Sequence, residues 1–164
     1  MTTETDRAED QARAQMESIT AMAARYEHAQ QCAGDTDCDL DGEDIVEGLG
    51  YAYSGSCTSE QREEYHDADA ASTMLDENPL SIEVRSAWHE FGNASPFPNQ
   101  EGAEFRILLC TGGPAVRIMG ELDERGGPDR AWIEYQDWGT PWTQYFGADQ
   151  EVLLSYAQHF LYAM

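Results

Sequence analysis

Acidic side chains between residues 41 and 69 are the feature of this sequence with the clearest chemical potential. Carboxylates three or four residues apart on a helix lie about 5–6 Å from one another. Neighbouring phosphates of a nucleic-acid strand have a similar spacing, because an axial rise of about 3.4 Å is lengthened by rotation. A row of carboxylates could therefore occupy a basic nucleic-acid channel, and the alternative is a solvated surface that confers solubility or reflects a salty or acidic host. The predicted contact residues are Asp41, Glu43, Glu60, Glu63, Glu64, Asp67 and Asp69.

The segment 37–43, Asp-Cys-Asp-Leu-Asp-Gly-Glu, is similar to the first half of a calcium-binding loop. Asp37, Asp39 and Asp41 alternate as oxygen ligands in such a loop, and Gly42 allows its sharp turn. A complete loop needs a bidentate acid at its twelfth position, which is Gly48 in this chain. Calcium binding, or a structural accessory role built on this loop, is the main alternative function.

The cysteines and histidines offer a second candidate metal site. Cys32, Cys38 and Cys57 could bind zinc together with His28 or His66, because thiolate and imidazole are the ligands that zinc prefers. The spacing is not that of a CxxC motif, and the ligands must converge from separate positions. A Cys32–Cys38 disulfide is the alternative in an oxidising medium, and reduced thiols are expected inside a cell.

Cys110 is the candidate nucleophile, because it precedes the Thr-Gly-Gly-Pro segment 111–114 at the end of a predicted strand. His89 or His159 would have to act as its base. A lowered thiol pKa needs positive surroundings, whereas this chain is strongly negative. We therefore expect an inert thiol and a protein that is not an enzyme.

The charge balance limits the class of partner. The 164 residues include 32 Asp and Glu against 9 Arg and no Lys, which gives a net charge of −23. A direct nucleic-acid partner or an anionic membrane needs positive charge on the protein, so both are disfavoured and a basic protein partner is favoured. No apolar run approaches the roughly 20 residues of a membrane span, and no apolar stretch follows Met1. These patterns predict a cytoplasmic protein, and the length of the chain predicts one domain over 1–164.

The acidic part, residues 1–79, reads as helical. Apolar residues recur every three or four positions over 6–31, which predicts an amphipathic helix. A short helix is expected over 44–49. Thr58 and Gln61 form a capping-box pattern, which opens a predicted surface helix that runs to about Met74.

Residues 80–164 change to the alternation that is typical of strands. Gly-Gly-Pro turns at 112–114 and 126–128 separate neighbouring strands, so the predicted topology is an antiparallel meander of four strands. Asp149 is the expected N-cap of a final helix that packs on the sheet. The predicted fold class is α+β. The predicted strands lie within 80–85, 105–110, 116–122 and 131–136, and the predicted mobile link lies within 91–102.

Aromatic residues gather between Trp132 and Phe146. Packing over the sheet is one interpretation, and a protein interface is the other, because aromatic side chains are enriched at interfaces. Trp138 is the residue of this group that we expect to contact a partner.

Three segments carry a resemblance to a known family: SIEVRSAW at 81–88, EFRILLCTGGPAVRIMGELD at 104–123, and EYQDWGTPWT at 134–143. They resemble small acidic proteins carried by bacterial phages, plasmids and integrative elements. The resemblance implies an accessory protein that acts in a bacterial cell. Together with the carboxylates, it predicts a nucleic-acid mimic that blocks a basic site on a host defence complex, of the anti-CRISPR or antirestriction type.

Overall fold

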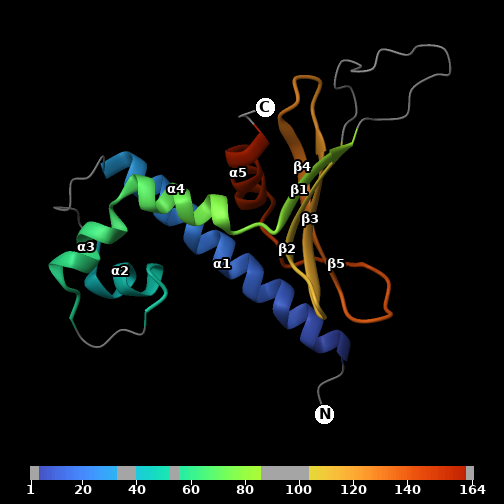
Figure 1. Ribbon diagram of the computed structural model, residues 1–164, viewed down its shortest axis with the longest axis horizontal. Helices are drawn as coiled ribbons and strands as arrows, with labels where there is room; N and C mark the ends of the chain where they lie inside the picture. The colour runs from blue at the N-terminus through green and yellow to red at the C-terminus, as the bar shows by residue number, and fades with distance from the viewer. Residues whose placement is uncertain (1–3, 33–39, 52–55, 86–103, 162–164) are drawn as a thin grey trace. The chain divides into compact units, whose positions relative to one another are not determined.

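Helices occupy the first half of the chain and strands most of the second (Figure 1). The computed structural model describes residues 4–32, 40–51, 56–85 and 104–161. The chain divides into two compact units, which we call unit 1 (residues 1–19 and 79–164) and unit 2 (residues 20–78). The predicted α+β class is confirmed. In the described part of the chain, every helix is too short or too polar to cross a bilayer.

Helix α1 (Glu4–Cys32) contributes its first half to unit 1 and its second half to unit 2. The helix predicted over 6–31 is therefore confirmed. Its buried side chains follow the helical period of three or four residues, as expected for one apolar face. They are Ala8, Ala12, Met16, Ile19, Met22, Arg25 and Ala29.

Unit 1 is built on one antiparallel sheet whose strands follow one another in chain order. The predicted meander is confirmed, and so are the turns at 111–114 and 125–128 that join its strands. A fifth strand, β5, extends the four that the alternation predicts, and three residues are too few for alternation to reveal it. The predicted link at 91–102 lies outside the described residues. The strands are β1 (Ser81–Arg85), β2 (Glu104–Cys110), β3 (Ala115–Leu122), β4 (Pro128–Gln136) and β5 (Thr143–Tyr145).

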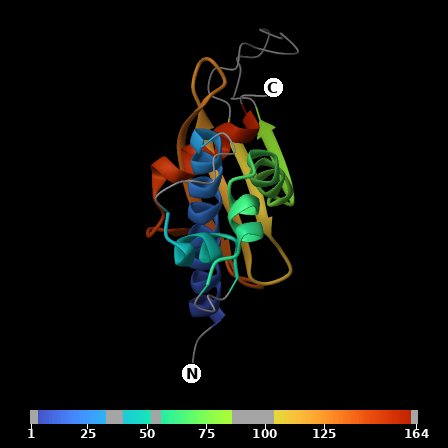
Figure 2. The same ribbon diagram turned by 90° about the vertical axis from the view of Figure 1, so that its left-hand side faces the viewer.

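The core of unit 1 lies between the sheet and two helical segments. Helix α5 (Gln150–Leu161) packs on β4, and Asp149 accepts hydrogen bonds from the amides of Glu151 and Val152, as the N-cap prediction requires. In Figure 2 the first half of α1 lies in front of the strands. The side chains that fill this core include Phe105, Ile107, Val116, Ile118, Ile133, Leu153, Tyr156 and Ala157.

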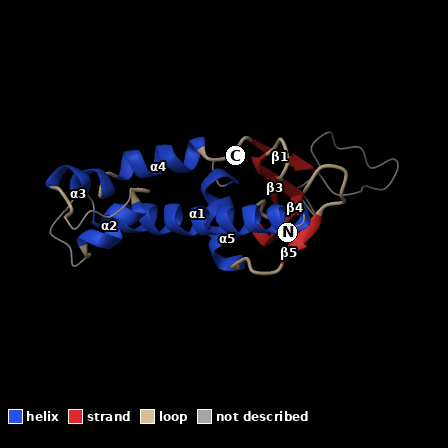
Figure 3. Cartoon of the chain, turned by 90° about the horizontal axis from the view of Figure 1, so that it is seen from below, coloured by secondary structure: helices blue, strands red, loops and turns tan. Residues whose placement is uncertain are grey.

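Unit 2 contains the second half of α1 and three short helices, α2 (Gly42–Gly48), α3 (Ser59–Tyr65) and α4 (Ala68–Glu77). Figure 3 shows α4 beside the second half of α1. The Arg25 guanidinium on α1 lies 3.6 Å from the Met74 sulfur on α4, in agreement with this arrangement. The capping box of Thr58 and Gln61 is present at the start of α3.

The prediction of one continuous helix from 58 to 74 is wrong. The helix ends at Tyr65, and α4 begins after Asp67, whose carboxylate accepts hydrogen bonds from the amides of Asp69 and Ala70. An Asp side chain that bonds the amides of the following turn favours a helix start over a helix interior. The break places His66 between the two helices, where its side chain is buried.

Gly120 in β3 is a position where the sheet has no room for a side chain. A Cβ atom there would overlap the Phe105 ring and the backbone carbonyl oxygen of Arg130. We expect Gly120→Ala to lower the free energy of unfolding of unit 1 by about 1–3 kcal/mol, the usual cost of overpacking. All four tryptophans lie in unit 1, so denaturant unfolding followed by tryptophan fluorescence measures this change. Ser155→Ala, on the exposed side of α5, is the control, and an equal effect there would contradict the explanation.

Candidate acidic surface and candidate metal centre

The acidic residues of α3 share one face of that helix. Glu60, Glu63 and Glu64 are exposed and occupy positions i, i+3 and i+4 of the helix, whereas Asp67, also exposed, comes after the end of α3 and caps α4. On the other side of α3, Tyr65 is buried. We call Glu60, Glu63 and Glu64 the α3 acidic face. The other predicted contact residues of unit 2, Asp41, Glu43 and Asp69, are exposed as well.

Two of the predicted contact residues also begin helices. Asp41 caps α2, and its Oδ1 atom accepts a hydrogen bond from the amide of Glu43 at 3.1 Å. Asp67 caps α4 through two bonds of 3.0 Å. Capping holds these carboxylates in fixed directions and leaves them in solvent. Asp37 and Asp39, the other two predicted calcium ligands, lie outside the described residues.

Unit 2 has few positive charges to balance these acids. It holds fifteen Asp and Glu but two Arg. The Arg25 side chain is 6% exposed and donates to the backbone oxygen of Glu64 at 2.8 Å. Arg62 lies 3.5 Å from the backbone oxygen of Leu40. Among the described residues, no ion pair reaches the α3 acidic face.

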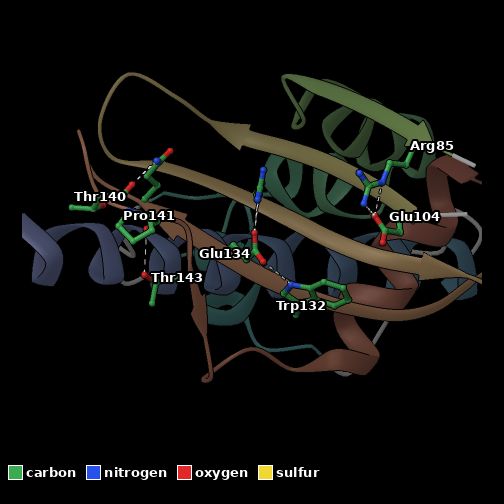
Figure 4. A network of polar contacts seen from close by, with 9 residues as sticks. Arg85, Glu104, Trp132, Glu134, Thr140, Pro141 and Thr143 are labelled. Carbon is green, nitrogen blue, oxygen red and sulfur yellow. Dashed lines mark hydrogen bonds and ion pairs between the residues drawn. The ribbon is translucent and has the colours of Figure 1, made fainter. Parts of the chain in front are cut away.

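In unit 1, by contrast, Arg side chains on the strands form ion pairs with several of the carboxylates. Arg117 and Glu134 form a half-buried pair with N–O distances of 2.9 and 2.7 Å. The same Glu134 accepts a hydrogen bond from the Trp132 indole at 3.0 Å, as Figure 4 shows together with the pair of Arg85 and Glu104. Further pairs join Arg106 to Glu83 and Arg130 to Glu121. The unneutralised acidity is thus concentrated in unit 2.

In the aromatic cluster, Trp142 is packed and Trp138 is exposed. The Arg117 guanidinium lies 3.9 Å from the centre of the Trp142 ring, which packs that indole against the sheet. Trp138 is 77% exposed, and its indole nitrogen donates to the backbone oxygen of Gly112 at 2.9 Å. Of the predicted contact residues, Trp138 is the one that belongs to unit 1.

Three metal-binding side chains converge in unit 2. His28 and Cys32 lie on α1, and His66 follows α3. The Nε2 atoms of the two histidines are 3.1 Å apart, and the Cys32 sulfur is 3.3 Å from Nε2 of His28. All three donor atoms lie within 4.8 Å of one another. The sequence offered His28 or His66 as a partner of Cys32, and the structure brings both histidines together with this cysteine.

Cys57, the other predicted zinc ligand within the described residues, does not join this group. The Cys57 thiol lies 3.5 Å from the backbone oxygen of Thr58, and Cys38 lies outside the described residues, as does the proposed disulfide. Sequence reasoning missed the meeting of His28 and His66, because it depends on the break between α3 and α4. The spacing of four between His28 and Cys32 on a helix was the available signal.

The surroundings of Cys110 favour a protonated thiol. Burial raises the pKa of Cys110, partly offset by hydrogen bonding from the Val116 backbone and the Gln11 side chain. A nucleophilic cysteine needs the opposite shift. Of the two proposed bases, His89 lies outside the described residues, and the His159 ring packs edge-on against Phe160.

Comparison with known proteins finds no matching family model, no similar curated protein and no similar solved structure. The resemblance to small proteins of mobile elements stays a prediction.

Salt should stabilise unit 2, because its carboxylates repel one another. Raising the ionic strength from about 0.01 M to 0.15 M shortens the Debye length from about 30 to 8 Å and screens this repulsion. We expect the helical circular-dichroism signal of the metal-free chain to melt at a higher temperature in the saltier buffer. A lower melting temperature would mean that attractive ion pairs outweigh the repulsion.

Cys110 should react slowly with a thiol reagent in the folded protein. Its raised pKa leaves less thiolate at pH 8 than an unfolded cysteine has, and thiolate is the reacting form. A variant in which Cys32, Cys38 and Cys57 are changed to Ser isolates this thiol. Labelling should accelerate when denaturant is added, and equally fast labelling in the folded protein would indicate an activated nucleophile.

Proposed function

We propose that unit 2 is an acidic binding module that occupies a basic, nucleic-acid-binding surface of a partner protein. The observation that carries this proposal is the α3 acidic face, where three exposed carboxylates share one side of a helix and no described Arg forms an ion pair with them. Exposed acids with this spacing resemble a short run of phosphates in charge and separation.

The electrostatic balance supports binding to a basic partner. Bringing fifteen carboxylates into a unit of 59 residues costs self-repulsion in the free protein. A groove lined by Lys and Arg would relieve that repulsion and would accelerate association by steering. The same charge disfavours direct contact with nucleic acid, so the proposed role is competition for a site that normally binds DNA or RNA.

The biological setting of this proposal rests on the resemblance of residues 81–143 to proteins of phages, plasmids and integrative elements. In that setting the partner is a nucleic-acid-handling complex of the bacterial host, and the protein is an inhibitor of the anti-CRISPR or antirestriction type without catalytic activity. The exposed Trp138 indole would add an apolar contact.

Charge reversal on the α3 acidic face should abolish capture of the partner. Immobilised protein is incubated with a bacterial lysate at low salt, and retained proteins are eluted with a salt gradient. We expect retained proteins to be basic nucleic-acid binders that added duplex DNA displaces, and we expect Glu60→Lys, Glu63→Lys and Glu64→Lys combined to prevent retention.

The matched control makes the same change of charge in unit 1, at Glu121, Asp123 and Glu124. This control variant should retain the partner with affinity reduced less than threefold. If both triple variants lose binding equally, net charge alone explains the interaction. If the α3 variant keeps full affinity, the proposed function is wrong.

A further inference from the structure

We propose that His28, Cys32 and His66 form a zinc site inside unit 2. This inference goes beyond the acidic binding function and does not rest on it. The site takes one divalent zinc ion through Nε2 of each histidine and the sulfur of the cysteine.

The separations of the donor atoms fit a tetrahedral ion. Zinc bonds of about 2.0–2.1 Å to nitrogen and about 2.3 Å to sulfur place two nitrogens about 3.3 Å apart and a nitrogen and a sulfur about 3.5 Å apart. The structure has 3.1 Å between the two Nε2 atoms and 3.3 Å between Nε2 of His28 and the sulfur of Cys32. The third pair, Nε2 of His66 and the sulfur of Cys32, lies within 4.8 Å, and a side-chain movement that brings this pair to about 3.5 Å would complete the coordination.

The backbone holds His66 with its coordinating nitrogen toward the other two ligands. Nδ1 of His66 lies 2.7 Å from the backbone oxygen of Arg62. A carbonyl oxygen can only accept, so Nδ1 carries the proton and the lone pair of the neutral ring is on Nε2. A hydrogen bond from the second ring nitrogen to a backbone carbonyl is the usual support of a zinc-bound histidine.

The other two ligands come from one face of α1. His28 and Cys32 are separated by four residues, which places their side chains one turn apart on the same side of the helix.

One zinc ion can bind all three donor atoms at the same time. Nε2 of His28 faces both Nε2 of His66 and the sulfur of Cys32. A single proton shared by the two nitrogens makes a hydrogen bond between them, but it does not bind the sulfur. When zinc binds, the Cys32 thiol releases its proton to solvent and a sulfur–zinc bond forms. Three protein ligands leave one position of a tetrahedron to water. The ion would link α1 to the end of α3, which carries the acidic face.

The test uses the full chain, freed of metal by a chelator and titrated with Co²⁺ and Zn²⁺. Cobalt that is bound by a thiolate has a sulfur-to-metal charge-transfer band, whereas cobalt bound by carboxylates lacks it. We expect one Co²⁺ per chain with this band, and we expect one equivalent of Zn²⁺ to displace it.

Variants then identify the ligands. Cys32→Ser should remove the charge-transfer band, and His28→Gln and His66→Gln should each weaken Zn²⁺ binding at least tenfold in competition with a chromogenic chelator. Cys110→Ser and His159→Gln, which change the same residue types in unit 1, should leave both readouts unchanged. Circular dichroism checks that each variant is helical. If the buried His66 is necessary for folding, His28→Gln alone tests the contribution of the histidines. Absence of the band in the original chain, or its survival in Cys32→Ser, would overturn the proposal.

Discussion

Repulsion among carboxylates is the constraint on which the organisation of unit 2 depends. An unpaired charge loses its hydration in the interior, and the twelve acids of unit 2 that lie in the described residues are all exposed. The apolar residues that remain are few, and they occupy the inner sides of those helices: Ile45, Val46, Tyr65, Ala71 and Leu75. Unit 2 therefore has a small core under a strongly charged surface. Its folding depends on the polar contacts between its helices more than the folding of unit 1 does.

Arg25 makes one such contact between helices. A guanidinium in so acidic a unit could have neutralised surface carboxylates. Instead it is buried, donates to the backbone oxygen of Glu64 and lies 5.9 Å from the centre of the Tyr65 ring. It thereby holds the end of α3 against α1. Its charge remains beneath the surface, and among the described residues it forms no ion pair with the acidic residues of α3. The same contact that stabilises α3 therefore also preserves the electronegative character of its outer face.

Local patterns in the sequence predicted the elements, and contacts between distant residues explain what they missed. The capping box at Thr58 and the alternation in β2, β3 and β4 involve residues that are close in the sequence, so the sequence predicted both. The acidic residues of α3 were identified for the same reason, since charge and spacing decide their exposure. The break at Asp67 was missed because an Asp can sit on a helix surface or cap a new helix. The His28–His66 contact spans 38 positions, and no local pattern encodes it.

The acidic face and the histidine–cysteine cluster depend on the same segment of chain. His66 follows directly on Tyr65 at the end of α3, the helix that carries the acidic face, and Asp67 then starts α4. A ligand that fixes His66 to α1 would restrict how α3 and its carboxylates can turn. A divalent cation would also offset part of the negative charge of unit 2, since opposite charges in a partly buried environment are weakly screened. Cation binding and presentation of the acidic face would then favour the same ordered arrangement of α1 and α3, although each can be measured without the other.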